Sequence, residues 1–369
     1  MMKVCVDIQA AVAQRAGVGR YAKSLVEHLG PLAGNDELSL FYFDFKGRGD
    51  PFPVPNATRK AVRWCPGRLV QQAWKRLGWP PFDWFAGRAE VYHFPNFIIP
   101  PLARGKAVVT IHDLAFKRFP ETTERRNLDH LTSQIGKTVA RADAIIAVSA
   151  FVAREIHELL GVPASRIFAI PSGMAGAWAA PSADSVTAMR REFGLDRPYL
   201  LTVGTLEPRK NVAFLVEVFE RMKFDGDLVI AGAPGWKYEP ILDRIRRSAR
   251  APRLRHLRYV AEKHLAALYA GAELFVFPSL YEGFGFTPLE AMACGVPVLA
   301  AATGSLPEVL GVAAEIVPGY DAADWADRAD RLLTDTARRA ELKERGFLQA
   351  RRFSWDETAR KTWQVYRGL

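Results

Sequence analysis

Short apolar runs alternate with segments of helix length along almost the whole chain, and this alternation is the strongest constraint on the fold. The predicted strands form two series, over 3–8, 37–43, 91–94, 107–111, 144–148 and 166–170, then over 199–203, 227–231, 256–260, 273–278, 296–300 and 313–317. The predicted helices between them include 18–29, 125–141, 150–160, 211–222 and 262–270. Continuous apolar strands separated by helices are typical of parallel sheets covered on both faces. Two such series predict an α/β fold with two doubly wound, Rossmann-like domains.

The length of 369 residues is sufficient for two domains. We predict a first domain over 1–175 and a second over 199–354, joined by a linker over 176–198 that begins with Pro, Ser and small residues. The last segment, 355–369, has the pattern of a helix. In open parallel sheets, ligands bind beyond the carboxyl ends of the strands, so we expect residues after the strands of both domains to face a common cleft.

Composition excludes several classes of protein. No apolar run reaches the roughly 18 residues of a membrane-spanning helix. The N-terminal residues resemble a first strand rather than a signal peptide, since Asp7 interrupts the apolar run early. Cys5, Cys65 and Cys294 have no metal-ligand spacing and cannot all pair, which favours a reduced cytoplasmic protein. The net charge of +10 predicts an anionic partner: a phosphate-rich ligand, an anionic membrane surface or nucleic acid.

Two acids, Glu282 and Glu290, are the only charged residues in the run SLYEGFGFTPLEAMACGVPVLA at 279–300. A buried carboxylate without a partner is costly, and this window offers no cation. Thr287 and Pro288 predict a helix start with Glu290 as a capping-box acid, which would give Glu290 a structural role. A polyhydroxylated ligand such as a sugar would instead engage both acids.

Between these acids lie Gly283, Phe284 and Gly285, just before the predicted helix. Backbone amides at a helix N-terminus suit hydroxyl or phosphate oxygens. We therefore include these three residues in the candidate ligand site.

A second candidate site is the loop VGTLEPRKN at 203–211. It follows a predicted strand with Gly204 and places Arg209 and Lys210 before a helix that Asn211 can cap. Two adjacent cations in this setting predict a phosphate site, with a solvated basic turn as the structural alternative.

Two further features follow strands of the first series. Gly17 and Gly19 lie in RAGVGRYA at 15–22, which matches G-x-G-x-x-A but begins too far beyond Ile8 for a typical dinucleotide loop. We interpret it as a Gly-rich loop that brings backbone close to a ligand. His112 precedes Asp113 directly after the strand at 107–111, where it would orient a ligand or form a structural pair.

Two basic segments remain. In 68–85, basic residues interleave with Trp and Phe, which is typical either of an interfacial membrane helix or of a helix whose aromatic residues are core. The arginines between Arg244 and Arg258 favour a solvated face. Neither segment has a recognisable nucleic-acid-binding pattern, so nucleic acid is not a predicted partner.

These motifs together resemble the glycosyltransferase family 4 enzymes, which are retaining and have the two-domain GT-B fold. The most specific match is E-x7-E from Glu282 to Glu290, followed by VGTLEPRKN at 203–211. Supporting matches are GVGRY at 17–21, VYHFPNFIIPP at 91–101, TIHDLAF at 110–116, AVSAFVAREI at 147–156 and AGAPGW at 231–236. Several segments are most similar to bacterial mannosyltransferases of surface-polysaccharide assembly.

The resemblance implies a role for each candidate residue. Glu282 and the amides of 283–285 would contact the donor sugar, and Glu290 would hold the ribose. Arg209 and Lys210 would bind the diphosphate, although Thr205 stands where many relatives have Arg. From the first domain, Gly17 and Gly19 would approach the diphosphate and His112 the transferred sugar, while the last helix would cross back to that domain.

The resemblance also implies the partners. The donor would be a nucleotide-diphosphate sugar, with GDP-mannose favoured over a UDP-sugar, and no permanent cofactor or metal is expected. The acceptor would be a glycan or a lipid-linked glycan, reached by a cytoplasmic enzyme that touches an anionic membrane peripherally. Two other classes stay open from the residues alone: an NAD-dependent oxidoreductase using Gly17 and Gly19, and a non-catalytic basic binding protein.

Overall fold

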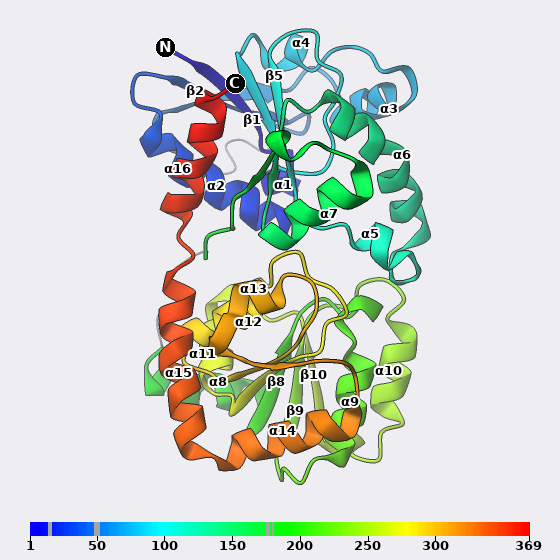
Figure 1. The fold of residues 1–369 in the computed structure, drawn as a ribbon, viewed down its shortest axis with the longest axis vertical. Coiled ribbons are helices and arrows are strands. Elements are labelled where there is room, and N and C mark those ends of the chain that lie inside the picture. The colour runs from blue at the N-terminus through cyan, green and yellow to red at the C-terminus, as the bar shows by residue number, and fades with distance from the viewer. Residues whose placement is uncertain (14–16, 48–51, 175–177, 179–180) are drawn as a thin grey trace. The chain divides into compact units, whose positions relative to one another are not determined.

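The chain forms two compact units in a computed structural model that describes residues 1–13, 17–47, 52–174, 178 and 181–369. The first unit contains Met1–Leu114, Arg126–Ala175 and Phe353–Leu369. The second contains Ala115–Arg125 and Gly176–Arg352. Each unit is built around its own parallel sheet (Figure 1).

The first unit has a seven-stranded sheet in the order β3-β2-β1-β4-β5-β6-β7, and all its paired strands are parallel. Its strands are β1 (Lys3–Asp7), β2 (Glu37–Phe43), β3 (Ala57–Val62), β4 (Val91–Phe94), β5 (Lys106–Ile111), β6 (Ala144–Ala147) and β7 (Ile167–Ala169). Its helices are α1 (Gln9–Ala13), α2 (Val18–Leu32), α3 (Gly67–Leu77), α4 (Asp83–Ala86), α6 (Arg125–Arg141), α7 (Ala150–Leu160) and α16 (Trp355–Arg367), with a 3-10 turn η2 (Ala164–Arg166).

Strand β3 is absent from the predicted strands. Its sequence ATRKAV carries Arg59 and Lys60 and shows no continuous apolar run. It pairs only with β2, at the edge of the sheet. An edge strand tolerates charged residues because one side of it faces solvent, and charge there discourages pairing with other chains.

Helix α16 belongs to the first unit although it ends the chain, and it lies beside α2 (Figure 1). The side chain of Ser354 accepts a hydrogen bond from the Asp356 amide and starts the helix. Fully buried His93 on β4 shares a hydrogen bond of 2.5 Å with the Tyr366 hydroxyl. Burial lowers the pKa of His93 to about 3, so this ring is neutral and acts as a fixed polar link between sheet and helix.

The second unit has a six-stranded parallel sheet in the order β10-β9-β8-β11-β12-β13. Its strands are β8 (Tyr199–Val203), β9 (Asp227–Ala231), β10 (Leu254–Arg258), β11 (Leu274–Phe277), β12 (Val298–Ala301) and β13 (Glu315–Val317). Its helices are α5 (Ala115–Arg118), α8 (Ala183–Phe193), α9 (Val212–Arg221), α10 (Glu239–Arg246), α11 (Glu262–Ala270), α12 (Phe286–Ala293), α13 (Leu306–Leu310), α14 (Ala322–Thr334) and α15 (Thr336–Arg351). The 3-10 turns are η1 (Pro120–Thr122), η3 (Pro208–Lys210), η4 (Ala251–Arg253) and η5 (Gly311–Ala313). The predicted class, two doubly wound Rossmann-like domains, is confirmed.

Helix α8 (Ala183–Phe193) lies within the expected linker over 176–198 and belongs to the second unit, which corrects the prediction. Residues 176, 177, 179 and 180 lie outside the described residues, but α8 follows Ser182, whose hydroxyl accepts a hydrogen bond from the Ser185 amide. Helix α8 packs against α11 within the second unit. The helix buries Met189, as an ordinary amphipathic helix does. The small residues that precede it led to the incorrect prediction of a linker.

Residues 115–125 also differ from the expected division, because they belong to the second unit. The Trp236 indole donates to the Thr122 carbonyl at 2.6 Å, and Lys237 donates to the Glu121 carbonyl at 2.6 Å. These hydrogen bonds to backbone carbonyls hold the segment to the loop after β9.

Each sheet reverses its strand order once, between β1 and β4 in the first unit and between β8 and β11 in the second. At such a point the loops on either side leave in opposite directions and open a crevice beyond the carboxyl ends of the strands. The loop after β8 lies in the motif 203–211, and the loop after β11, 278–285, contains Glu282, the first acid of E-x7-E. The two most specific motifs of the sequence therefore lie at this reversal.

The core of the second unit includes Trp325 on α14, which is fully buried and packs against Phe214 and Tyr320. Its indole donates to the Gly319 carbonyl at 3.0 Å. The helix thus fixes the turn after β13 by packing and by a hydrogen bond.

Trp325→Ala is expected to lower the free energy of unfolding of the second unit by about 3–5 kcal/mol, because it leaves a large cavity. Denaturant unfolding followed by circular dichroism measures this, with separate transitions allowed for the two units. Leu348→Ala, at an exposed site on α15, is the control and should change stability by less than about 0.5 kcal/mol. Equal effects of the two substitutions would contradict this account of the core.

Candidate functional site

Lys210 and Glu282 meet at the point where the second sheet reverses its strand order. The Lys210 ammonium lies 2.5 Å from Glu282 Oε1, although the residues are 72 apart in the chain. The side chains are only 15% and 10% exposed. The missing partner of Glu282 is therefore supplied by the other predicted motif, and the two candidate sites are one.

Arg209 completes this cluster but is engaged by protein groups. It donates to Glu207 Oε1 at 2.6 Å and to the Tyr281 carbonyl at 2.8 Å, and lies 3.3 Å from Glu282 Oε2. Glu207 is buried and was not among the predicted site residues. The signal for it was present, since an acid two residues before Arg in a loop after a buried strand needs a partner.

The charges of these four residues balance. Burial alone would raise the pKa of Glu282, but Lys210 and Arg209 outweigh burial and hold that pKa below its usual value. At Glu207 burial prevails over the same two cations and raises the pKa. Two cations and two acids therefore form a nearly neutral cluster in which Glu282 is the firmly ionised acid.

Backbone crowding at the end of β8 sets the position of Lys210. A Cβ atom on Gly232 would lie 1.8 Å from the Gly204 carbonyl oxygen, so the β8 and β9 loops approach as closely as glycine allows. The Lys210 stem passes over Gly204, whose missing Cβ would lie 3.4 Å from Lys210 Cε. The ammonium also lies 5.1 Å from the centre of the Phe277 ring. Its position is thus fixed by packing as well as by charge.

The loop after β11 runs from Ser279 to the N-terminus of α12. Gly283, Phe284 and Gly285 are buried and precede the helix directly, as predicted. Helix α12 starts at Phe286, with Gly285 as N-cap at φ 98°, so the prediction of Thr287 as N-cap is wrong. A left-handed cap of this kind requires glycine, and no hydroxyl cap is used.

Glu290 is therefore not a capping-box acid but an interior residue of α12. It is buried and accepts a hydrogen bond of 2.9 Å from the Tyr269 hydroxyl. Tyr269 lies on α11, so the acid is oriented from a neighbouring helix.

Ser279 orients Glu282 and was missed from the sequence. Its hydroxyl donates to Glu282 Oε1 at 2.6 Å, and its carbonyl accepts hydrogen bonds from Thr303 at 2.7 Å and Tyr320 at 2.8 Å. The Ser305 amide and hydroxyl both donate to the Glu282 carbonyl, at 3.0 and 3.1 Å. Single hydroxyls in separate loops leave no spacing pattern, so this network could not be predicted from the sequence.

In the first unit, His112 follows β5 and donates from Nε2 to the Pro95 carbonyl at 2.9 Å. Burial lowers the pKa of His112, so the ring is neutral and its Nδ1 is a hydrogen-bond acceptor. The Tyr21 ring packs edge-on against it at 4.7 Å. Gly17 is the N-cap of α2 at φ 56° and Gly19 is buried in its first turn, while Arg15 and Ala16 of the same motif lie outside the described residues.

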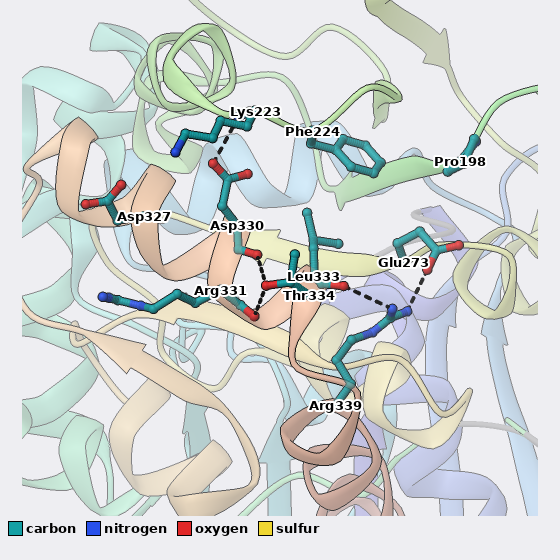
Figure 2. A pocket seen from close by; sticks show the side chains of 10 residues that line it. All are labelled: Pro198, Lys223, Phe224, Glu273, Asp327, Asp330, Arg331, Leu333, Thr334 and Arg339. Carbon is teal, nitrogen blue, oxygen red and sulfur yellow. Dashed lines mark hydrogen bonds and ion pairs between the residues drawn. The ribbon is translucent and has the colours of Figure 1, made fainter.

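A pocket of about 770 Å³ lies elsewhere in the second unit (Figure 2). Its lining includes Pro198 and Glu273, which directly precede β8 and β11, so it opens at the amino ends of the strands. None of the predicted site residues lines it. Its Arg339 pairs with Glu273 at 2.5 Å and its Asp330 accepts from the Lys223 amide at 2.9 Å.

Several of the arginines between 244 and 258 are used within the fold. Arg244 donates through both terminal nitrogens to Glu220, and Arg253 pairs with Asp225. Arg250 donates to the Phe219 and Phe224 carbonyls and lies 3.9 Å from the centre of the Phe219 ring. These side chains are committed to internal partners.

The described residues include no group of three or more His, Cys, Asp or Glu placed to hold a metal ion. Across the same residues, no helix has both the length and the apolar character needed to cross a membrane.

Comparison with known proteins defines the class. Residues 15–175 match the family model of Glycosyltransferase Family 4 and residues 186–349 that of Glycosyl transferases group 1. The fold matches sucrose-phosphate synthase from Thermosynechococcus elongatus with a TM-score of 0.78 and 21% identity, over 100% of this chain and 99% of that one. HepE of Anabaena, solved in complex with UDP-glucose, matches over 100% of both chains with a TM-score of 0.75 and 18% identity.

The chain is a glycosyltransferase with the GT-B fold, and it belongs to glycosyltransferase family 4. It is 30% identical to the O-antigen chain mannosyltransferase B of Escherichia coli, over 96% of both chains. It is also 34% identical to the serotype-specific mannosyltransferase WbdA of Escherichia coli, over 59% of this chain and 28% of that protein. The resemblance to mannosyltransferases of polysaccharide assembly is confirmed.

Substitutions of Lys210 and Glu282 are expected to have non-additive effects on stability, because the two side chains form an ion pair. Lys210→Met should lower the free energy of unfolding by about 1–3 kcal/mol, because Glu282 loses its nearest cation while staying buried. Lys210→Met/Glu282→Gln should cost less than the sum of the single substitutions, by roughly 0.5–3 kcal/mol. A double-mutant cycle in denaturant measures this, and strict additivity would contradict the pair.

The stability cost of Lys210→Met is also expected to depend on pH. A carboxyl whose pKa is lower in the folded state stabilises the fold above its unfolded pKa, ordinarily 4.5, and this stabilisation is lost as the pH falls through the folded value. The cost of Lys210→Met should therefore be larger at pH 7 than at pH 4. A cost that does not change between these values would contradict the assignment of Glu282 as the ionised partner.

Proposed function

We propose that this glycosyltransferase transfers mannose, with retention of configuration, from GDP-mannose to a glycan or lipid-linked acceptor in surface-polysaccharide synthesis. The observation that carries the proposal is the Lys210–Glu282 cluster at the strand-order reversal of the second sheet. A sugar diphosphate presents phosphate oxygens and hydroxyl donors side by side, which matches a cation next to a carboxylate. The match to O-antigen chain mannosyltransferase B over nearly the full length supports mannose as the sugar.

Lys210 is proposed to bind the diphosphate. An ammonium group has three N–H donors, and one of them is directed at Glu282. The others are available for phosphate oxygens, where negative charge develops as the leaving group departs. Arg209 is proposed to support the diphosphate mainly through its charge, because its guanidinium is held by Glu207 and the Tyr281 carbonyl.

Glu282 and Glu290 are proposed to contact hydroxyl groups of the donor. Glu282, with the amides of Gly283, Phe284 and Gly285, would hold the sugar, and Ser279 would fix the carboxylate orientation. Glu290 would accept hydrogen bonds from the ribose while Tyr269 holds one of its oxygens. In both cases the carboxylate is oriented by protein groups before any ligand arrives, which lowers the entropic cost of binding.

In the first unit, Gly17 and Gly19 are proposed to allow close approach of backbone to the diphosphate. His112 is proposed to accept a hydrogen bond from the transferred sugar through Nδ1, consistent with its neutral ring and the engagement of Nε2 with Pro95. Retention would follow from attack on the face that the diphosphate leaves, with the leaving phosphate accepting the proton of the acceptor hydroxyl. The reaction is proposed to take place on the cytoplasmic side of the membrane without a metal ion.

Lys210→Ala should lower turnover of GDP-mannose by about 10² to 10³, as expected for loss of one donor to a developing charge. Release of GDP in the presence of a mannosyl acceptor measures this. Lys223→Ala, which removes an exposed lysine of the same unit, should have near-native turnover. Near-native turnover of Lys210→Ala would exclude the diphosphate role.

The donor is tested by thermal unfolding with GDP, UDP, ADP, dTDP and NAD⁺ compared side by side. A ligand at about 100 times its Kd should stabilise the folded state by roughly 2.7 kcal/mol. We expect GDP alone to give a large shift. A shift with UDP alone would retain the fold and the phosphate site and replace the donor by a UDP-sugar, and a shift with NAD⁺ alone would overturn the proposed site.

A further inference from the structure

Exposed large apolar side chains are concentrated between residues 64 and 84 of the first unit. They are Trp64 (73% exposed), Leu69 (66%), Leu77 (75%), Trp79 (57%) and Trp84 (64%). All three exposed tryptophans of the described chain fall within this stretch. Single exposed apolar residues are ordinary on protein surfaces, but such a concentration marks an interaction site.

These side chains are held in place by the core beneath them. On the inner side of α3 and α4, the Trp74 indole donates to the Pro80 carbonyl at 2.6 Å and its ring packs against buried Phe82. On the outer side, Trp79 and Trp84 pack edge to face at 5.5 Å. The ring of Trp64 stacks on Phe85, also at 5.5 Å.

The core alternative for this segment holds for part of its apolar residues, and membrane contact stays a prediction. Val70, Trp74 and Phe82 pack inward, whereas the tryptophans and leucines named above remain outside.

The wider segment 59–88, which includes this stretch, carries most of the net charge of the protein. Residues 59–88 contain seven Lys or Arg and one Asp, so they contribute +7 − 1 = +6 of the total of +10. Six of these cations are exposed. Arg63 pairs with Asp44, and the other five are Lys60, Arg68, Lys75, Arg76 and Arg88. Within the described part of the chain, none of the five forms an ion pair.

We infer that this surface, formed by the exposed tryptophans, leucines and unpaired cations of residues 60–88, docks onto an anionic membrane. Tryptophan side chains favour the headgroup region, leucines the acyl boundary, and Lys and Arg the anionic headgroups. The combination matches all three layers of a lipid surface. A second copy of the same surface would bring like charges together, which disfavours self-association.

The docking surface extends the proposed function without depending on the donor. A lipid-linked acceptor is confined to a membrane, and an enzyme held at that membrane meets it at a high local concentration. All residues of the docking surface lie in the first unit, and their exposure and charge do not involve the donor site.

The test is flotation of the full-length protein with vesicles of phosphatidylglycerol and phosphatidylcholine, compared with vesicles of phosphatidylcholine alone. We expect binding to the anionic vesicles that weakens with added salt. Arg68→Gln/Lys75→Gln/Arg76→Gln should reduce the partition coefficient about fivefold for each cation, or about a hundredfold in total. Trp79→Ala/Trp84→Ala should reduce it roughly tenfold through lost apolar contact.

Matched controls distinguish a local surface from net charge. Arg191→Gln/Lys263→Gln/Arg351→Gln removes the same charge from exposed positions of the second unit and should leave vesicle binding within about twofold. Leu348→Ala removes an exposed apolar side chain far along the chain and should have no effect. If GDP still stabilises every variant against thermal unfolding, the fold and the donor site are intact.

Three results would overturn the inference. One is absence of wild-type binding to anionic vesicles, and another is an equal loss of binding in both charge-removing triples. The third is self-association or binding to nucleic acid that the Trp79 and Trp84 substitutions abolish while vesicle binding persists. Because nucleotide stabilisation is measured separately, failure of the docking surface is distinguishable from failure of the proposed function.

Discussion

The ion pair between Lys210 and Glu282 is the interaction on which the arrangement of the second unit's site depends. A carboxylate with so little exposure is stable in the ionised form only because cations compensate its lost hydration. Those cations come from a loop 72 residues earlier, so the pair requires that β8 and β11 be neighbours. The sheet order supplies this, and the Leu280 amide adds a direct hydrogen bond of 2.8 Å to the Arg209 carbonyl.

The surrounding network makes the pair rigid rather than merely close. Ser279 holds one oxygen of Glu282 while its own carbonyl is held by Thr303 and Tyr320. Tyr320 stacks on Trp325, so a core residue of α14 reaches the site through one intermediate. A site ordered in this way has already paid its conformational entropy before a ligand binds, which favours both affinity and a defined geometry for the reacting groups.

The sequence predicted those elements whose signal is local. Continuous apolar strands and the loops that follow them were correctly located because their pattern depends on burial alone. Strand β3 was missed because an edge strand need not be apolar, and α8 was missed because a run of small residues precedes it. The partner of Glu282 and the hydroxyls that orient it were beyond prediction, since they depend on which loops the sheet brings together. Glu290 fitted a capping pattern that the glycine cap of α12 makes unnecessary.

The two basic segments, 244–258 and 59–88, also differ in a way that the sequence does not predict, because the difference depends on which partners the fold places near them. Both are rich in arginine, but the segment around Arg250 lies among acids and helix-end carbonyls, where Glu220, Asp225 and backbone oxygens take up its donors. The stretch 59–88 has one acid, Asp83, and that carboxylate already accepts the Ala103 amide at 2.9 Å. The positive charge of this segment is consequently exposed at the surface, together with the exposed tryptophans. Composition alone cannot distinguish internally paired arginines from exposed ones, because the difference lies in the number of acids and carbonyls that the fold places nearby. The segment 59–88, whose charge is not neutralised, keeps exposed cations that can bind an anionic partner outside the chain.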